Sequence, residues 1–213
     1  MSELDPRLLS RIPHLEVTTF IRPPIEELLS EFAAVDDMFE RYVFDDEEVS
    51  TPAGAIEPSI TYQVIDVVGW PRSNRVRSLV PKTIAWIESI CETSPKARFT
   101  SVAPGSDTSW HRHAQGSEPV FFLHVPLRTN AGVRFGVRNT LSDQNVFWQH
   151  YDVGEAWLFN STHLHLVENR GVTNRYHLYA AIPVNDARFR ALVQGAIVNY
   201  SGPLLQESET ELT

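Results

Sequence analysis

Cysteine is almost absent from this sequence of 213 residues, which contains only Cys91. A single thiol excludes an internal disulfide framework, and its position in the apolar run TIAWIESIC favours a buried thiol over a nucleophile. Long apolar runs are also missing, so no segment is long enough to span a bilayer. The segment MSELDPRLLSRIPHLEV lacks the apolar core and the cleavage site of a signal peptide. We therefore expect a cytoplasmic protein.

Basic charge is in short supply, with 18 Lys and Arg against 27 Asp and Glu and a formal net charge of -9. Nucleic acids and anionic membranes are bound largely through basic patches, so neither is an expected partner. The expected partner is a small molecule, an amino acid or a peptide. The sequence indicates nothing about the oligomeric state.

The composition, 42% hydrophobic and 21% charged, is typical of a globular chain, and the length suits one domain over residues 1–213. Residues 1–96 have a mixed helical and extended pattern. Within them, Ile25–Phe44 repeats apolar residues at three and four after two prolines, and Pro81–Glu92 begins with proline, so both predict helices. The stretch DDEEVSTPAGAIEPS between them predicts a solvated loop.

The residue pattern of 97–184 is typical of a β-rich core. Six short segments rich in β-branched and aromatic residues are separated by turn signals: ARFTSVAPG, PVFFLHVPLRT, VRFGVRN, NVFWQHYDVGEAWLFN, HLHLVEN and RYHLYAAIPV. They predict a mainly β fold with flanking helices, a double-stranded β-helix or jelly-roll barrel. A C-terminal helix is expected over 185–200, capped by Asn185, and a disordered acidic tail over 204–213.

Two pairs of histidines stand out. On a strand, residues two apart point to the same face, so the rings of His111 and His113 can converge on one metal ion. His163 and His165 form a second pair fifty residues later. Histidine clusters from separate strands are typical of transition-metal sites. The first pair and one histidine of the second therefore predict a metal site.

The spacing around these histidines resembles the two cupin motifs. Gly105, His111-x-His113 and Glu118 match the first motif, although its closing glycine is absent. Gly154 to His165 has the spacing of the second. This resemblance implies a barrel in which His111, His113 and His165 hold the metal, with Glu118 as either a fourth ligand or a rim carboxylate.

Several stretches together resemble the aspartyl/asparaginyl β-hydroxylase family of Fe(II)/2-oxoglutarate-dependent oxygenases, which is similar to the free-proline hydroxylases. They are VAPG with a histidine six residues after its glycine, LHVPLRTN, VGEAWLFN, and H-x-V-x-N followed by Arg-x-His-Leu. The resemblance covers Pro81 to Val184. It implies Fe(II) as the metal, 2-oxoglutarate as the cosubstrate, dioxygen as the oxidant, and hydroxylation of an unactivated carbon.

By position, the resemblance implies that His111 is the proximal iron ligand and His165 the distal one. Only His165, and not His163, has the V-x-N continuation and the step of ten residues to Arg175. Arg175 matches the arginine that binds the far carboxylate of 2-oxoglutarate. If LHLVEN and RYHLY form a hairpin, His165 and Arg175 lie opposite each other on one face.

Three further residues are assigned to the cosubstrate. His124 and Thr100 match a histidine and a hydroxyl residue that contact 2-oxoglutarate in the family. His177 lies two residues after Arg175, on the same face of the predicted strand, and is expected either to contact the cosubstrate or to orient that arginine.

The sequence departs from the family in two places. Phe122 stands where the family often has an arginine near the iron, with Arg112 or Arg134 as candidate substitutes. His113 stands where facial-triad oxygenases have a carboxylate. Either His113 is a third ligand, or it turns toward the substrate and leaves two protein ligands.

The expected substrate is an aspartyl, asparaginyl or related amino-acid side chain, free or in a peptide. Its candidate carboxylate partners are Arg112, Arg128, Arg134 and Arg138. Two other functions keep the histidines. One is a three-histidine cupin, a dioxygenase or isomerase, that does not use 2-oxoglutarate and leaves Arg175 without a role. The other is a cupin that binds a metal or a ligand without turnover.

Overall fold

The computed structural model describes residues 8, 11–41, 62–70, 72–93, 95–113, 120–140, 142–183 and 185–206. In chain order the elements are β1 (Leu15–Glu16), α2 (Thr18–Ile21), α3 (Ile25–Phe32), β2 (Glu40–Arg41), β3 (Tyr62–Val68), the 3-10 helix η1 (Ser73–Arg75), α4 (Pro81–Ile90), β4 (Lys96–Val102), β5 (Ser106–Asp107), β6 (Val120–Arg128), β7 (Val133–Arg138), β8 (Phe147–Gln149), β9 (Trp157–Asn160), β10 (Leu164–Asn169), β11 (Arg175–Pro183) and α5 (Ala187–Val198). The predicted loop over residues 45–59 lies outside the described residues.

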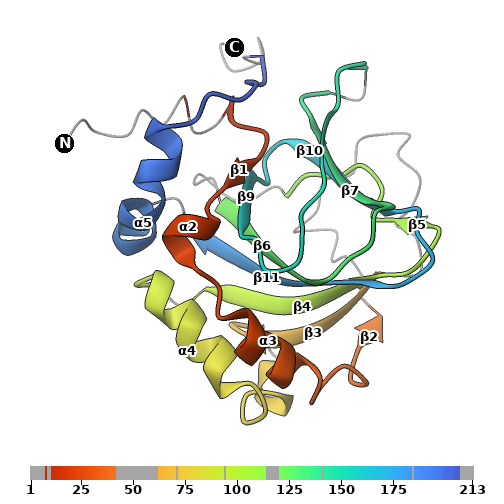
Figure 1. The fold of residues 1–213 in the computed structure, drawn as a ribbon, viewed down its shortest axis with the longest axis vertical. Helices are drawn as coiled ribbons and strands as arrows, with labels where there is room; N and C mark the ends of the chain where they lie inside the picture. Colours follow the sequence, from red (N-terminus) through yellow and green to blue (C-terminus); the bar gives the residue numbers. More distant parts are fainter. Residues whose placement is uncertain are drawn as a thin grey trace.

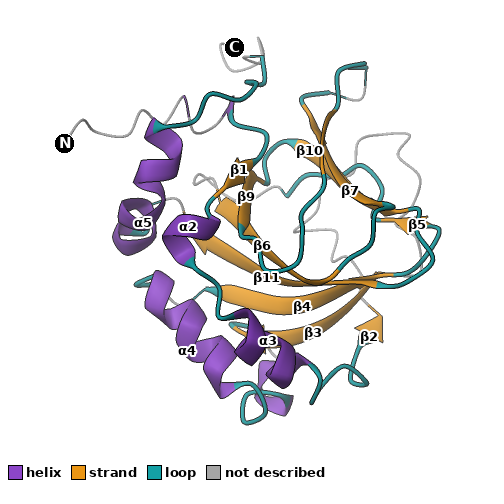
Figure 2. Ribbon diagram, in the orientation of Figure 1, coloured by secondary structure: helices purple, strands orange, loops and turns teal. Residues whose placement is uncertain are grey.

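Two antiparallel sheets form the centre of the molecule. The larger has the order β1-β9-β6-β11-β4-β3-β2, and the smaller has the order β5-β10-β7-β8. Helices α2, α3, α4 and α5 lie on one side of the larger sheet, and the smaller sheet lies on the other (Figures 1 and 2). Each of the six predicted β segments contains a strand, so the jelly-roll prediction is confirmed. Among the described strands no ladder joins the two sheets, which therefore face each other without closing into a barrel.

Because side chains alternate along a strand, the larger sheet builds two separate cores. One face packs against the helices through residues such as Phe99, Leu123 and Leu178. The other face meets the smaller sheet in a second, more aromatic core that includes Phe122 and Phe135. The candidate site residues lie in this second layer, between the sheets.

The first helix is shorter than the sequence predicts. It ends at Phe32 instead of Phe44, and the chain then turns before Glu40–Arg41 pairs with β3. Residues 42–44 lie outside the described residues. The chain after Phe32 instead forms turns, and Val35 is completely buried there.

Acidic side chains cap the first turns of the two longer helices. Glu31, in α3, accepts hydrogen bonds from the backbone N–H groups of Lys82 and Thr83 and from the Thr83 hydroxyl, at 2.7 to 2.8 Å. These groups lie in the first turn of α4, where backbone N–H groups lack partners within the helix. The second predicted helix is thus confirmed over Pro81–Ile90.

The cap of the C-terminal helix is Asp186, not Asn185. Its carboxylate accepts from the Phe189 N–H, and it also accepts from the backbone N–H groups of Glu92 and Thr93 and from the Thr93 hydroxyl. One buried carboxylate therefore joins the end of α4 to the start of α5. The sequence contains two possible caps in a row, and only this tertiary contact distinguishes them.

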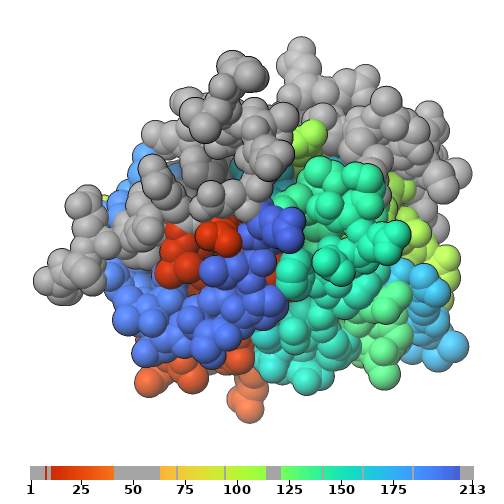
Figure 3. Space-filling view, turned by 90° about the horizontal axis from the view of Figure 1, so that it is seen from above, coloured from red at the N-terminus to blue at the C-terminus, as the bar shows by residue number. Residues whose placement is uncertain are grey.

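The predicted tail begins with packed residues. Leu205 is buried, its N–H donates to the Arg11 carbonyl at 2.8 Å, and the Arg11 Nε donates back to the Leu205 carbonyl at 3.0 Å. The N-terminal and C-terminal segments accordingly lie side by side in the space-filling view (Figure 3). Residues 207–213 of the predicted tail lie outside the described residues.

Cys91 is buried, as predicted, and its thiol donates to the Ile87 carbonyl. Burial is the main cause that raises the pKa of Cys91 to about 11, so the reactive thiolate is scarce at neutral pH. In the described part of the chain, no helix has both the length and the apolar character needed to cross a membrane.

Candidate functional site

Three histidines meet between the two sheets. His111 and His165 form an isolated antiparallel bridge, with backbone hydrogen bonds of 3.1 and 2.9 Å in the two directions. The His113 N–H donates to the Ser161 carbonyl at 3.0 Å, which brings its ring to the same place. One nitrogen from each ring lies within 4.8 Å of the other two. The structure therefore brings His111, His113 and His165 together, as predicted.

Backbone carbonyls set the orientation of two of these rings. The Nδ1 of His111 lies 2.9 Å from the Ser109 carbonyl, and the Nδ1 of His165 lies 2.9 Å from the His163 carbonyl. A carbonyl accepts, so Nδ1 carries the proton and Nε2 keeps the lone pair that a metal needs. Ser109 has a φ of 57°, and its N–H donates to the Asp107 carboxylate. This uncommon left-handed conformation is what aims the Ser109 carbonyl at His111.

Burial keeps the three rings neutral. It is the main cause that lowers the pKa of His111, His113 and His165 below the usual value. For His113, the charges of His111 and Arg98 lower the pKa further. Neutral imidazole is the form that ligates metals, so this cluster has the donor set of a site for a divalent transition ion.

The other predicted ligands do not join the cluster. His163, the alternative to His165, is only half buried and is not part of the group whose nitrogens converge. Its contribution is the backbone carbonyl that holds His165. Glu118 lies outside the described residues.

Arg175 occupies the same pocket as the histidines. Its side chain is 1% exposed, its Nη1 donates to the Thr100 hydroxyl at 3.3 Å, and its guanidinium carbon lies 5.1 Å from the centre of the Phe135 ring. The pocket is lined by Arg98, Thr108, His111, His113, Phe122, His124, Phe135, Phe159, His165, Val167, Arg175 and Tyr179. A buried guanidinium beside an aromatic ring and a hydroxyl fits an anion with two oxygens.

Two more predicted residues, His124 and His177, lie beside Arg175. Their ring centres are 5.8 Å apart, and the ring nitrogens of both are buried without a hydrogen-bond partner in the described part of the chain. Burial, and next the charge of Arg175, lowers the pKa of both rings well below the usual value. Each neutral ring carries one N–H, and a buried N–H without an acceptor is costly in a native fold. A carboxylate held by Arg175 is the kind of group that would supply acceptors there.

The predicted hairpin between residues 165 and 175 is wrong. Strand β10 pairs with β7 and β5 in the smaller sheet, whereas β11 pairs with β4 and β6 in the larger one. The Asn169 side chain donates to the carbonyls of Val102 and Thr173 and so fixes the crossing between the sheets. Strand β11 is buried on both faces, which requires a central place in the larger sheet. His165 and Arg175 thus reach the pocket from opposite sheets.

The four arginines predicted to bind a substrate carboxylate do not line the pocket. Arg112 is exposed, and Arg128 is half exposed and paired with Asp36. Arg134 and Arg138 stack on the rings of Trp148 and Trp110, each at 3.9 Å. None of these four arginines lines the pocket, so neither proposed substitute for the arginine missing at Phe122 is in place.

Sequence reasoning missed a second arginine that lines the pocket beside Arg175, namely Arg98. It lies on β4, two residues before Thr100, and is 5% exposed. Because residues two apart on a strand share a face, the assignment of Thr100 already implied that Arg98 faces the same pocket. In the segment ARFTSV, the two-residue spacing of Arg98 and Thr100 is the sequence feature that predicts this position.

Comparison with known proteins gives the family. The family model described as "Aspartyl/Asparaginyl beta-hydroxylase" matches residues 30–183, which is more than half of the chain. The chain belongs to the aspartyl/asparaginyl β-hydroxylase family. The matched region begins well before the stretch in which the sequence motifs lie. Membership supports hydroxylase, and therefore oxygenase, activity in general terms. No curated protein matches the chain by sequence.

Several solved structures are similar to this member of the β-hydroxylase family, and the first of them shares its fold. A Trichoplax adhaerens prolyl hydroxylase, solved in complex with a peptide fragment of the hypoxia inducible factor oxygen degradation domain, is 14% identical with a TM-score of 0.51, over 79% of this chain and 80% of that one. A Pseudomonas putida prolyl-4-hydroxylase is 14% identical with a TM-score of 0.45, over 82% and 91%. A 2OG-Fe(II) oxygenase family oxidoreductase from Burkholderia pseudomallei is 15% identical with a TM-score of 0.42, over 63% and 74%.

Proposed function

We propose that the protein is an Fe(II)- and 2-oxoglutarate-dependent dioxygenase that hydroxylates an unactivated carbon of an aspartyl, asparaginyl or related amino-acid side chain, free or in a peptide. The observation that carries the proposal is the composition of one pocket. Three neutral histidines converge at one place in it, and the buried Arg175 lines another together with His124. The ring nitrogens of His124 and of its neighbour His177, which is buried behind the lining residues, have no partner in the described part of the chain.

His111, His113 and His165 would hold the iron. All three ligands are neutral, so the ion keeps its full double charge, which favours anionic cosubstrates over neutral ones. The backbone carbonyls of Ser109 and His163 hold two of the rings in the required tautomer. When bound, Fe(II) and 2-oxoglutarate supply with dioxygen the oxidising chemistry that converts a C–H bond into C–OH.

Arg175 would bind the carboxylate of 2-oxoglutarate that lies far from the iron. Thr100 accepts a hydrogen bond from Arg175 and so fixes the plane of the guanidinium. The N–H groups of His124 and His177 would donate to the same carboxylate. Both rings stay neutral because burial lowers their pKa, so they act as donors without adding positive charge.

Aromatic side chains exclude water from this site. Phe122, Phe135 and Phe159 line the pocket and are at most 2% exposed. A dry pocket strengthens the attraction between Arg175 and a carboxylate, because the local dielectric is low.

The visible spectrum of the anaerobic protein tests this function. Fe(II) followed by 2-oxoglutarate should produce a charge-transfer band that needs both additions. Arg175→Met, which removes the guanidinium but keeps an unbranched chain, should weaken cosubstrate binding at least tenfold. Arg128→Met is the matched control, because Arg128 is half exposed and does not line the pocket.

A three-histidine cupin that does not use 2-oxoglutarate is the competing function. It accounts for His111, His113 and His165 but gives no role to the buried Arg175 or to the unpartnered nitrogens of His124 and His177. If iron binds, no band appears and Arg175→Met changes nothing, that function replaces the one proposed here.

The choice of His165 over His163 is tested by iron content. His165→Ala should lose bound Fe(II). His163→Ala should retain it, because the contact that His163 makes to His165 comes from its backbone carbonyl. Equal loss in both variants would argue against the assigned ligand set.

A further inference from the structure

Arg98 is a second buried arginine in the histidine pocket, and the proposed function has not used it. It lies on β4 opposite Tyr179 of β11 on one side and opposite Asp66 of β3 on the other. Its side chain is 5% exposed and lines the pocket together with His113. A buried guanidinium is seldom found without an anionic partner or a ligand.

The side chain of Arg98 is held in a fixed place. Its Nε and Nη2 both lie 3.1 Å from the same oxygen, Oδ1, of Asp66. Its guanidinium carbon lies 3.5 Å from the centre of the Trp70 ring, a cation–π contact that fixes the plane of the guanidinium. A preorganised guanidinium of this kind loses little conformational freedom when it binds a carboxylate.

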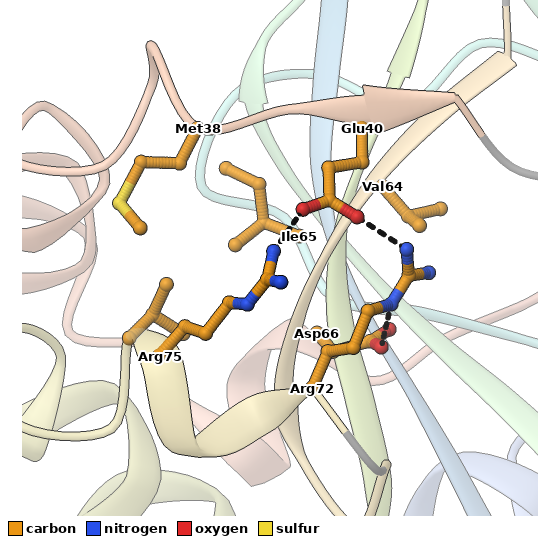
Figure 4. A pocket seen from close by; sticks show the side chains of 8 residues that line it. Met38, Glu40, Val64, Ile65, Asp66, Arg72 and Arg75 are labelled. Atoms are coloured by element: carbon orange, nitrogen blue, oxygen red, sulfur yellow. Dashed lines mark hydrogen bonds and ion pairs between the residues drawn. The ribbon is translucent and has the colours of Figure 1, made fainter.

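Asp66 forms ion pairs with two arginines, Arg98 and Arg72. Its second oxygen, Oδ2, accepts from the Nε of Arg72 at 3.3 Å, and Glu40 pairs with both Arg72 and Arg75 (Figure 4). This chain of ion pairs runs from a surface pocket to the inner face of the sheet. Asp66 therefore contacts two guanidinium groups, one through each of its oxygens.

The two buried arginines act on different parts of the pocket. Arg175 lies opposite Val102 on β4, four residues from Arg98, which is about 13 Å along the strand at the usual rise per residue. The guanidinium carbon of Arg175 lies 5.1 Å from the centre of the Phe135 ring, whereas that of Arg98 lies 3.5 Å from the centre of the Trp70 ring.

The half of the pocket near Arg98 contains the most exposed of the three clustered histidines. His113 is the one half-buried member of the three-histidine cluster, and the other two are buried. A cosubstrate bound at Arg175 occupies the deeper end. A molecule that arrives later meets His113 and Arg98.

We propose that Arg98 binds a carboxylate of the substrate and that Asp66 and Trp70 position it for this role. The substrate class is then an amino acid or an acidic peptide residue whose carboxylate reaches the His113 side of the pocket. This inference rests on the proposed function and deepens it, because it names the group that selects the substrate.

The test uses the anaerobic holoprotein with Fe(II) and 2-oxoglutarate. The probes are the free L-amino acids, each paired with its α-carboxamide, and the pair L-aspartate and L-asparagine covers a side-chain carboxylate. Binding is read from the change that each probe makes in the visible band. The proteins compared are the wild type, Arg98→Met, Arg98→Lys and, as the matched control, Arg72→Met. Arg72 belongs to the same chain of ion pairs but does not line the pocket.

The wild type should bind at least one carboxylate about 10- to 100-fold more tightly than its amide. Arg98→Met should remove this preference and leave the 2-oxoglutarate affinity within about twofold of wild type. Arg98→Lys keeps the charge that Asp66 requires, so it should fold and bind the carboxylate with intermediate affinity. In turnover of the bound compound, Asp66→Asn should raise KM with little change in kcat, which a purely structural role of Asp66 would not do.

Three results would overturn the inference: equal binding of acid and amide by the wild type, no response to any probe although the band forms, or weaker 2-oxoglutarate binding as the main effect of Arg98→Met. The last would assign Arg98 to the cosubstrate. If the band does not form in the wild type at all, the proposed function itself has failed, and that outcome is distinct from these three.

Discussion

The unpartnered nitrogens of His177 predict a variant that is more stable and less functional than the wild type. The His177 ring is completely buried, and within the described residues neither of its nitrogens has a hydrogen-bond partner. A buried polar group without a partner costs about 1–3 kcal/mol. Leucine has nearly the same volume and no polar atoms, so His177→Leu should raise the free energy of unfolding of the ligand-free protein by about that amount.

His14 provides the matched control. It is also buried, but its Nδ1 lies 2.7 Å from the Tyr151 hydroxyl and its Nε2 lies 2.9 Å from the Phe147 carbonyl. His14→Leu removes both partners, so it should lower the free energy of unfolding by about 1–3 kcal/mol. Replacement of histidine by leucine is thus expected to raise the free energy of unfolding at His177 and to lower it at His14.

Urea unfolding of the metal-free proteins at pH 8 measures both effects, provided that the slope with urea is unchanged. In a parallel thermal-shift assay with metal, 2-oxoglutarate should stabilise the wild type, and His177→Leu should reduce that stabilisation. The reasoning is refuted if His177→Leu destabilises the protein as much as His14→Leu does. That result would mean that the native fold satisfies the His177 ring and that a role in binding is not needed to explain it.

Three further predictions concern pH, helix capping and the metal. Burial lowers the pKa of His14 to about 4, so between pH 6.5 and 4 the unfolded chain binds a proton that the fold does not. His14→Gln should therefore remove about 3 kcal/mol of acid-dependent loss of stability in that window. Asp186→Ala breaks four hydrogen bonds and should cost about 3–5 kcal/mol in urea unfolding, whereas a cost near that of the exposed Asp37→Ala would contradict its role as a shared cap. Removal of Fe(II) by a chelator should lower the melting temperature of the wild type and leave that of His165→Ala unchanged, since binding to the native state alone stabilises it.

Much of the architecture could be predicted from local patterns. Short segments rich in β-branched and aromatic residues, separated by turn signals, located the strands, because such side chains suit a pleated and half-buried sheet. Proline at the first turn located α4. The predicted helix boundaries were wrong where contacts with residues far away in the sequence decide where the helix begins or ends. Helix α3 stops early because the chain after Phe32 turns toward β3, and α5 takes Asp186 as its cap because that carboxylate also binds Thr93.

The candidate site was predictable to the extent that its residues share strand faces. His111 with His113 and Arg175 with His177 are each two residues apart, so each pair was correctly expected on one face. Which strands pair with each other could not be predicted from the spacing of residues within one strand. Local turn signals favoured a hairpin between β10 and β11, whereas burial of β11 on both faces placed the two strands in different sheets.

By itself, the sequence determined the class of fold, the histidines that can bind a metal and the family, because periodicity and motif spacing are local properties of the chain. Only the tertiary structure decided that Arg112, Arg128, Arg134 and Arg138 do not line the pocket. The exposed and stacked positions of Arg128, Arg134 and Arg138, and the inward position of Arg98, depend on which sheet each strand joins and which face it turns inward. Those choices are made by contacts between residues far apart in the chain, where burial of aromatic side chains and pairing of charges outweigh local preference.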